Sequence, residues 1–185
     1  MKGFILGVIL TLAVLAAAVY IYFVTGMAPV ATAAQAMPFE KMLAHKALHA
    51  RVEKEMPHES PIQPDEANLA AGAQTYIQHC SVCHGLPDQQ QTAIAQGEFP
   101  KPPNLFKGKG VTDDEAGETY WKVDNGIRLT GMPAFGKHLS ATQMWQVSLL
   151  LANASKLPAP VMATLRSATQ PTSVPAPANP AAPGK

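Results

Sequence analysis

Residues 80–84 read CSVCH and hold the only two cysteines of the chain, three positions apart, with a histidine directly after the second. Four kinds of site use such residues. A disulfide between Cys80 and Cys83 would close a very small loop and remove little chain entropy. A redox dithiol of the thioredoxin type needs a βαβ context, which the sequence lacks, and zinc needs four ligands, whereas no second cysteine pair exists.

The fourth kind of site is covalent attachment of haem, for which C-x-x-C-H is a sequence signature. Two thiols one helical turn apart can each bond a vinyl group along one edge of the porphyrin, and the next residue can turn its imidazole under the iron. The spacing of Cys80, Cys83 and His84 therefore favours one covalently held haem c over the other three interpretations.

A second axial ligand is expected from a distant loop, and Gly131-Met132-Pro133 fits that role. Gly131 permits close backbone approach and Pro133 restricts φ, so Met132 can be held without a helix around it. His/Met is a common ligand pair in cytochromes c. The alternatives are Met144, which lies in a predicted helix and is more simply a packing residue, and a Met132 that covers the haem without binding the iron.

The residues around these motifs predict a small all-α domain with long loops, over 65–157. Helices are expected from Asp65 up to the cysteines, over 113–125, and from Ser140 to a point before Pro158. The Gly- and Pro-rich stretches between them show no alternation typical of a strand. A domain of this size with such long loops has few residues for a hydrophobic core. The loops therefore indicate that a bound group fills its centre.

The N-terminal segment, residues 1–26, predicts a transmembrane anchor. Residues 4–24 contain no charge and no proline, and about twenty residues at about 1.5 Å rise match a hydrocarbon core of about 30 Å. The alternative is a cleaved signal peptide with its small-x-small site at 34–36. The apolar stretch exceeds the roughly 7–15 residues of a signal h-region, which favours a retained single span.

Two further segments flank the predicted domain. Residues 27–64 predict an amphipathic helix over 39–56 and then a stiff, extended connector, because three prolines follow between 57 and 64. Residues 158–185 are rich in Pro and Ala and predict a disordered tail, since this composition buries too little apolar surface to offset chain entropy.

The charge pattern excludes some partners. The net charge is +1 with both signs interspersed, so no basic stripe is available for a nucleic acid. The predicted domain carries seven basic and nine acidic residues and no ring of lysines, so a partner with a strongly acidic docking site is not implied.

Several stretches of the predicted domain match a known family: Gly72 and Tyr76 ahead of CSVCHG, then PPNL at 102–105, NGIRLTGMPAFG at 125–136 and LSATQMWQVSLLL at 139–151. In these residues the chain resembles the class I cytochromes c, especially short bacterial single-haem domains. The resemblance covers about half of the chain and excludes the anchor, the connector and the tail. It implies that Gly72 and Tyr76 meet Trp145 where the first and last helices of the domain cross.

The resemblance also implies further residues around the haem. A carbonyl of Pro102 or Pro103 is expected to accept a hydrogen bond from Nδ1 of His84 and so fix the imidazole ring. Arg128 and Trp121 are candidate contacts to the haem propionates or to the methionine loop, the alternative being a surface arginine and a core tryptophan.

A haem with two protein ligands has no open position, so the expected function is single-electron transfer without a catalytic residue or a small-molecule substrate. Haem c is attached outside the cytoplasm in the resembled bacterial family, which implies a bacterial inner membrane protein with its haem domain in the periplasm and redox proteins of a respiratory chain as partners. The alternatives are a permanently bound subunit of a larger membrane redox complex and, if Met132 leaves the iron, a gas-binding sensor or peroxidase-like enzyme.

Overall fold

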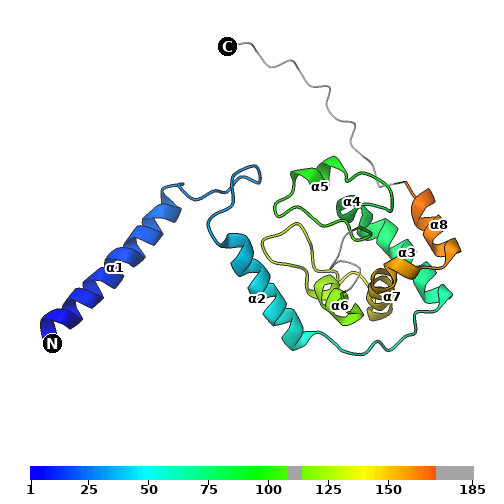
Figure 1. Cartoon of the computed structure of the whole chain (residues 1–185), viewed down its shortest axis with the longest axis horizontal. Helices are drawn as coiled ribbons and strands as arrows, with labels where there is room; N and C mark the ends of the chain where they lie inside the picture. The colour runs from blue at the N-terminus through cyan, green and yellow to red at the C-terminus, as the bar shows by residue number, and fades with distance from the viewer. Residues whose placement is uncertain (108–113, 170–185) are drawn as a thin grey trace, which may run out of the picture. The chain divides into compact units, whose positions relative to one another are not determined.

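The computed structural model describes residues 1–107 and 114–169, and all regular structure in these ranges is helical (Figure 1). This confirms the all-α fold class. Contacts divide the chain into two units, Met1–Ala44 and His45–Lys185. The helices are α1 (Lys2–Val24), α2 (Glu40–Glu55), α3 (Glu66–His79), α4 (Ser81–His84), α5 (Ala93–Gly97), α6 (Ala116–Asn125), α7 (Ala141–Ala152) and α8 (Ala159–Ser167), with a 3₁₀ turn at Ala154–Lys156.

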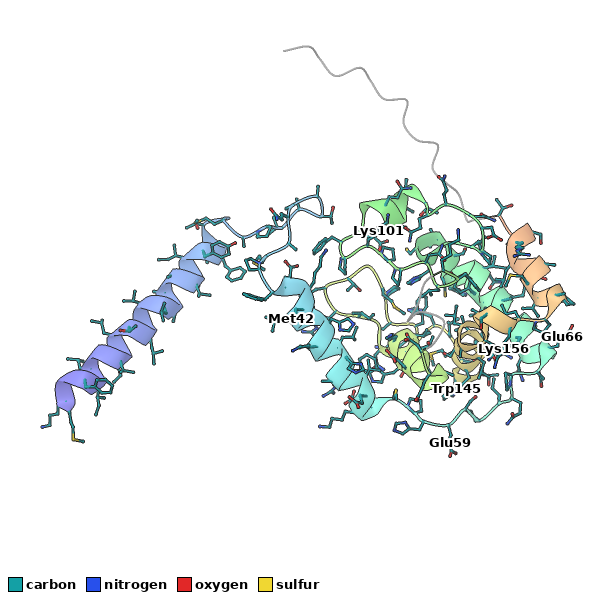
Figure 2. All side chains as sticks on the ribbon, viewed as in Figure 1. Met42, Glu59, Glu66, Lys101, Trp145 and Lys156 are labelled. Atoms are coloured by element: carbon teal, nitrogen blue, oxygen red, sulfur yellow. The ribbon has the colours of Figure 1, made fainter. Side chains whose placement is uncertain are left out.

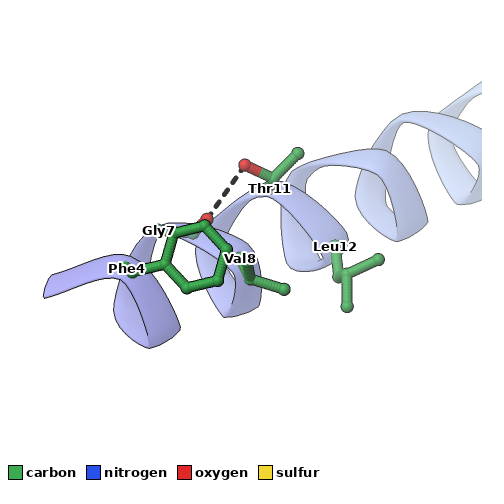
Figure 3. A pocket seen from close by; sticks show the side chains of 5 residues that line it. All are labelled: Phe4, Gly7, Val8, Thr11 and Leu12. Carbon is green, nitrogen blue, oxygen red and sulfur yellow. Dashed lines mark hydrogen bonds between the residues drawn. The ribbon is translucent and has the colours of Figure 1, made fainter. Parts of the chain in front are cut away.

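Helix α1 is long and apolar enough to cross a membrane, and none of its residues is buried. Two threonine hydroxyls bond to helix carbonyls: Thr11 donates to the Gly7 carbonyl at 2.9 Å, and Thr25, the residue after the helix, donates to the Ile21 carbonyl at 2.7 Å. Figure 3 shows the first of these bonds beside a shallow hollow of the helix surface. Such internal pairing suits a helix in lipid, where water is absent.

The crossing of α3 and α7 forms the centre of the second unit. Asp65, the residue at which the sequence predicts this helix to begin, caps α3 by accepting a hydrogen bond from the Asn68 N–H at 2.8 Å. At the crossing, a Cβ on Gly72 would collide with the carbonyl oxygen of Gln146 and lie 3.2 Å from the Leu150 Cβ. Only glycine lets the two backbones approach this closely.

The aromatic partner of Trp145 differs from the expectation. Trp145, labelled in Figure 2, stacks on Tyr120 of α6 with ring centroids 4.4 Å apart. Tyr76 instead packs edge-on against Phe106 at 5.1 Å. The ring that stacks on Trp145 therefore comes from α6, which packs against α7, and not from Tyr76 of α3.

The chain around Glu55 and Pro57 packs on α6. In α2, Val52 is 1% exposed and Glu55 accepts a hydrogen bond from the Trp121 indole N–H at 3.2 Å. A Cβ on Gly117 would collide with the carbonyl oxygen of Pro57. The segment predicted as an amphipathic helix and a stiff connector therefore contacts the helical domain, although most of the apolar stripe of α2 is exposed.

The prediction of disorder from residue 158 is wrong for its first part. Helix α8 buries Val161 (2% exposed) and Leu165 (0% exposed) and packs against α3. Arg166 pairs with Asp88 at 3.0 Å. Apolar side chains four positions apart form one helical face, a pattern that the overall Pro/Ala composition concealed. The rest of the expected tail, 170–185, lies outside the described residues.

Candidate haem site

The two cysteines belong to one short helical turn, with Cys80 directly before it and Cys83 inside it. Helix α3 ends at His79, Cys80 follows, and α4 begins at Ser81. The N–H of His84 donates to the Cys80 carbonyl at 2.9 Å, and that of Cys83 to the same oxygen at 3.2 Å. Both cysteines are free thiols and half-buried. One turn thus presents two thiols and an imidazole together.

Both thiols are protonated at neutral pH. Burial, and then the nearby Cys83, raise the pKa of Cys80 to about 12. Burial, followed by a hydrogen bond to Glu98 and the charge of that carboxylate, raises the pKa of Cys83 to about 11. A redox dithiol requires the opposite, a stabilised thiolate. The environment therefore does not fit a thioredoxin-type pair.

The imidazole of His84 is oriented by a backbone carbonyl. Its Nδ1 lies 2.9 Å from the Pro103 carbonyl oxygen, which can only accept, so Nδ1 carries the proton. The other candidate, the Pro102 carbonyl, accepts from Gln91 at 2.8 Å. Burial lowers the pKa of His84, although the Pro103 bond and the charge of Glu98 act in the other direction. The neutral ring leaves the Nε2 lone pair free to bind a metal.

Two side chains fix the backbone around this turn. The buried Tyr76 hydroxyl donates to the Gly85 carbonyl at 2.6 Å, and the Thr92 hydroxyl donates to the Val82 carbonyl at 2.5 Å. Sequence reasoning identified Tyr76 only as a helix-packing residue and missed Thr92. The one available signal for Thr92 was its position as a cap before a short helix.

The loop that carries Met132 is closed by its own backbone. Gly126 has φ 66°, and a Cβ there would lie 2.6 Å from the Ala134 nitrogen. The Ile127 N–H donates to the Met132 carbonyl at 3.2 Å, and the Met132 N–H donates to the Thr130 hydroxyl at 3.1 Å. Met132 is half-buried against the core. The sequence pointed to Gly131 and Pro133 as supports, and the structure adds Gly126 and Thr130, which also hold the loop.

Glu98 links the cysteine turn to the methionine loop. One carboxylate oxygen accepts from the Cys83 thiol at 3.1 Å. The other oxygen lies where a Cβ on Gly131 would be. The structure therefore brings the two sequence-predicted halves of the site to a common residue. Nothing in the sequence marked Glu98, an isolated acid in a Gly- and Pro-rich stretch.

The remaining candidates lie apart from these contacts. The indole N–H of Trp121 is donated to Glu55. Arg128 is exposed and makes no hydrogen bond or ion pair within residues 1–107 and 114–169. Their proposed contacts with a haem stay predictions. Met144 of α7 is buried in the hydrophobic core, as expected of a packing residue.

Comparison with known proteins places this site in a class. Residues 67–149 match the family described as cytochrome C oxidase, cbb3-type, subunit III. This part of the chain is therefore a class I-like cytochrome c domain. No match was found among curated proteins.

One solved structure is also similar, the Kuenenia stuttgartiensis reducing HAO-like protein complex Kustc0457/Kustc0458. It has 24% sequence identity and a TM-score of 0.46, over 54% of this chain and 49% of that chain. The present chain thus spans about half the length of the solved one.

The residues present fit haem c, the cofactor that the cytochrome c family implies. The site offers two protonated thiols for thioether formation, a neutral imidazole with its Nδ1 already bonded, and a thioether side chain on the adjoining loop. No group of three or more His, Cys, Asp or Glu in the described part of the chain could hold a metal ion directly. The donor set suits a macrocycle better than a bare ion.

Proposed function

We propose that the protein is a membrane-anchored c-type cytochrome that carries single electrons in a respiratory chain. The hydrogen bond from His84 Nδ1 to Pro103, in the turn that bears both thiols, carries this proposal. Cys80 and Cys83 would hold one haem c covalently, and His84 and Met132 would be its axial ligands. When bound, haem supplies a one-electron iron couple.

The protein residues determine what this couple can do. Pro103 orients the His84 imidazole, and the Thr130 hydroxyl holds the backbone of Met132. If His84 and Met132 both bound the iron of a haem, no position on it would be left for a substrate, so the protein would need no acid, base or nucleophile. Methionine ligation and burial both disfavour the extra charge of the ferric state, so we expect a positive reduction potential.

The apolar helix α1 supports a single-pass anchor. Because haem c is attached outside the cytoplasm in the resembled bacterial proteins, we propose the inner membrane as its location, with the haem domain in the periplasm. Anchoring raises the effective concentration of the haem domain near membrane-bound redox partners.

The optical spectrum of the purified protein tests the ligand assignment. We expect a low-spin haem with the weak long-wavelength band of methionine-ligated ferric iron. We expect Met132→Ala to abolish that band and to create a site that binds carbon monoxide at once in the reduced state. Carbon monoxide binding to the reduced wild-type protein would instead favour a gas-binding sensor or peroxidase-like enzyme.

A second candidate function is a permanently bound haem subunit of a larger membrane redox complex. Two observations favour it: the family matched by residues 67–149 is named for an oxidase subunit, and α2 packs on the domain. Native electrophoresis in mild detergent separates the two functions. A free carrier migrates alone, whereas a subunit migrates with other haem proteins.

A further inference from the structure

Large apolar side chains that face solvent are concentrated just after the anchor helix. Beyond Val24, the described residues hold seven of them, and only Ile94 and Leu129 lie far along the chain. The other five lie between the end of α1 and the first turn of α2: Met27, Val30, Phe39, Met42 and Leu43. All five belong to the first unit, Met1–Ala44. Exposed apolar groups gathered in this way mark a surface that something covers.

Phe39 holds its ring in solvent on an unfavourable backbone. Its side chain is 70% exposed, and its φ of 64° lies in the left-handed region, where bulky residues are rare. Neighbouring bonds fix this geometry. The Glu40 carboxylate accepts from the Met37 N–H at 2.7 Å, and the Leu43 N–H donates to the Phe39 carbonyl at 2.9 Å. An exposed ring gains little from packing, so the fold by itself favours glycine or asparagine here.

Helix α2 has a buried side and an exposed apolar side. Val52, which is 1% exposed, comes nine positions after Leu43, and at about 100° per residue it lies on the opposite side of the helix. Glu55, which contacts α6, is on the Val52 side. Met42, labelled in Figure 2, and Leu43 are 45% and 59% exposed. Lys46 follows one turn later on their side and is exposed too.

The bilayer that would hold α1 is the covering that this side fits. Only residues 25–39 separate α1 from α2, so the start of α2 is within reach of the lipid that surrounds α1. Aromatic and aliphatic side chains beside a lysine are typical of helices in the headgroup region, where the lysine stem extends toward the phosphates. Residues 25–46 carry two lysines and one glutamate, so apolar burial contributes more than charge.

We propose that Phe39, Met42 and Leu43 insert into the interfacial region of the lipid bilayer, and this rests on the membrane anchor of the proposed function. The first turn of α2 then lies among the headgroups, with Lys46 directed to the lipid phosphates. The part of the chain left as a spacer shortens to residues 25–38. A shorter spacer raises the effective concentration of the haem domain near redox partners in the same membrane.

The test measures the depth of single nitroxide labels in the haem-loaded, full-length protein in phosphatidylcholine vesicles. Cys80 and Cys83 are the only native cysteines and would be bonded to haem, so an introduced cysteine is the one free thiol. Paramagnetic resonance with oxygen and a water-soluble nickel chelate as relaxants gives the depth of each label. For Leu43→Cys we expect about 5–10 Å below the lipid surface.

Three further variants make the result specific. Ala44→Cys places the label at the next residue, which is exposed on another side of the same helix, and should report water. Adding Phe39→Asn to Leu43→Cys removes the ring but suits the left-handed backbone. It should move the label toward water and leave the melting temperature unchanged or higher. Adding Ile94→Ser, which removes an exposed apolar side chain of the second unit, should not move the label.

A label at Val14→Cys, in the middle of α1, tests the anchor separately. If this label lies in the hydrocarbon and the Leu43 label is as accessible to the nickel chelate as the Ala44 label, the anchor stands and the inference fails. If the Val14 label is also in water, the anchor of the proposed function fails.

Two other outcomes would overturn the inference in favour of a protein partner. An immobilised Leu43 label that neither relaxant reaches would indicate contact with protein instead of lipid. Dipolar broadening between Leu43 labels, lost when labelled chains are diluted with unlabelled ones, would assign the surface to a second copy of the chain.

Discussion

At the scale of single residues, the site depends on atoms that are fixed before any cofactor binds. Pro103 determines which nitrogen of His84 carries the proton, and Thr130 holds the backbone of Met132. Glu98 contacts both halves of the site. Because Pro103 contributes a backbone group and Thr130 a short side chain, these two lose little conformational entropy when they hold His84 and Met132 in place.

Gly126→Ala tests the closure of the methionine loop. The new Cβ would lie 2.6 Å from the Ala134 nitrogen on a backbone with φ 66°, so we expect a loss of about 2 kcal/mol in the free energy of unfolding and a weaker methionine-ligation band. Urea unfolding and the ferric spectrum measure both. Gly97→Ala is the control, because nothing lies within 4 Å of its Cβ and its φ is ordinary. Equal effects of the two substitutions would contradict this account of the loop.

At the scale of elements, α6 joins the connector to the core. Its Tyr120 stacks on Trp145 of α7, while its Trp121 binds Glu55 of α2. Neighbouring positions of one helix point in different directions, so this helix contacts α7 and α2 at once. The sequence predicted the helix but not that it binds α2.

Trp121→Phe separates the two roles considered for this tryptophan. If its N–H only docks α2, the substitution should cost about 1 kcal/mol in the free energy of unfolding and speed hydrogen exchange of the amides around Val52. The reduction potential and the haem spectrum should not change. A shifted potential would instead indicate that Trp121 contacts the haem or its methionine loop.

Lys122 of α6 makes stability depend on alkaline pH. Burial lowers the pKa of Lys122, but hydrogen bonds and charges of Glu118 and Asp114, at 2.7 and 3.0 Å, outweigh this and raise it above the ordinary value of 10.5. The ion pairs thus stabilise the folded state fully below pH 10.5, and this contribution is lost as the pH rises through the raised pKa.

The wild type should therefore be more stable than Lys122→Met by about 1 kcal/mol near neutral pH, and the difference should shrink above pH 10.5. Chemical denaturation at a series of pH values measures it. Lys101→Met, at the exposed lysine labelled in Figure 2, should follow the wild type throughout. A difference that grows with pH would contradict the assignment.

At the scale of the whole molecule, the C-terminal helix extends the core. Helix α8 packs on α3, whose other contacts include α7 and α4. The helix that precedes the cysteine turn is therefore supported by two later segments of the chain, so α8 supports that turn through α3.

Leu165→Ala should lower the free energy of unfolding by about 3 kcal/mol, because it removes a fully buried side chain. Thermal unfolding of the haem-loaded protein measures the loss. Arg166→Ala, which breaks only the exposed pair with Asp88, should cost less than about 0.5 kcal/mol. If the two variants unfold alike, α8 does not contribute to the core.

Local sequence determined the all-helical secondary structure, the cysteine turn and the membrane-length helix. Each of these follows from a pattern within one continuous stretch of the chain. The motif CSVCH predicts haem attachment because two thiols one helical turn apart can reach one porphyrin edge and the following imidazole can reach the iron. The apolar run of α1 needed only its length and its lack of charge. These features are independent of the distant parts of the chain.

Tertiary structure alone decided the roles that need partners far away in the sequence. Glu98 meets Cys83 and Gly131, Glu55 accepts from Trp121, and Leu165 packs against α3. Composition and periodicity describe one segment at a time, so they carry no information on which segment will lie beside it. The packing of separate segments into one core therefore completed the site and turned the first residues of an apparent tail into a helix.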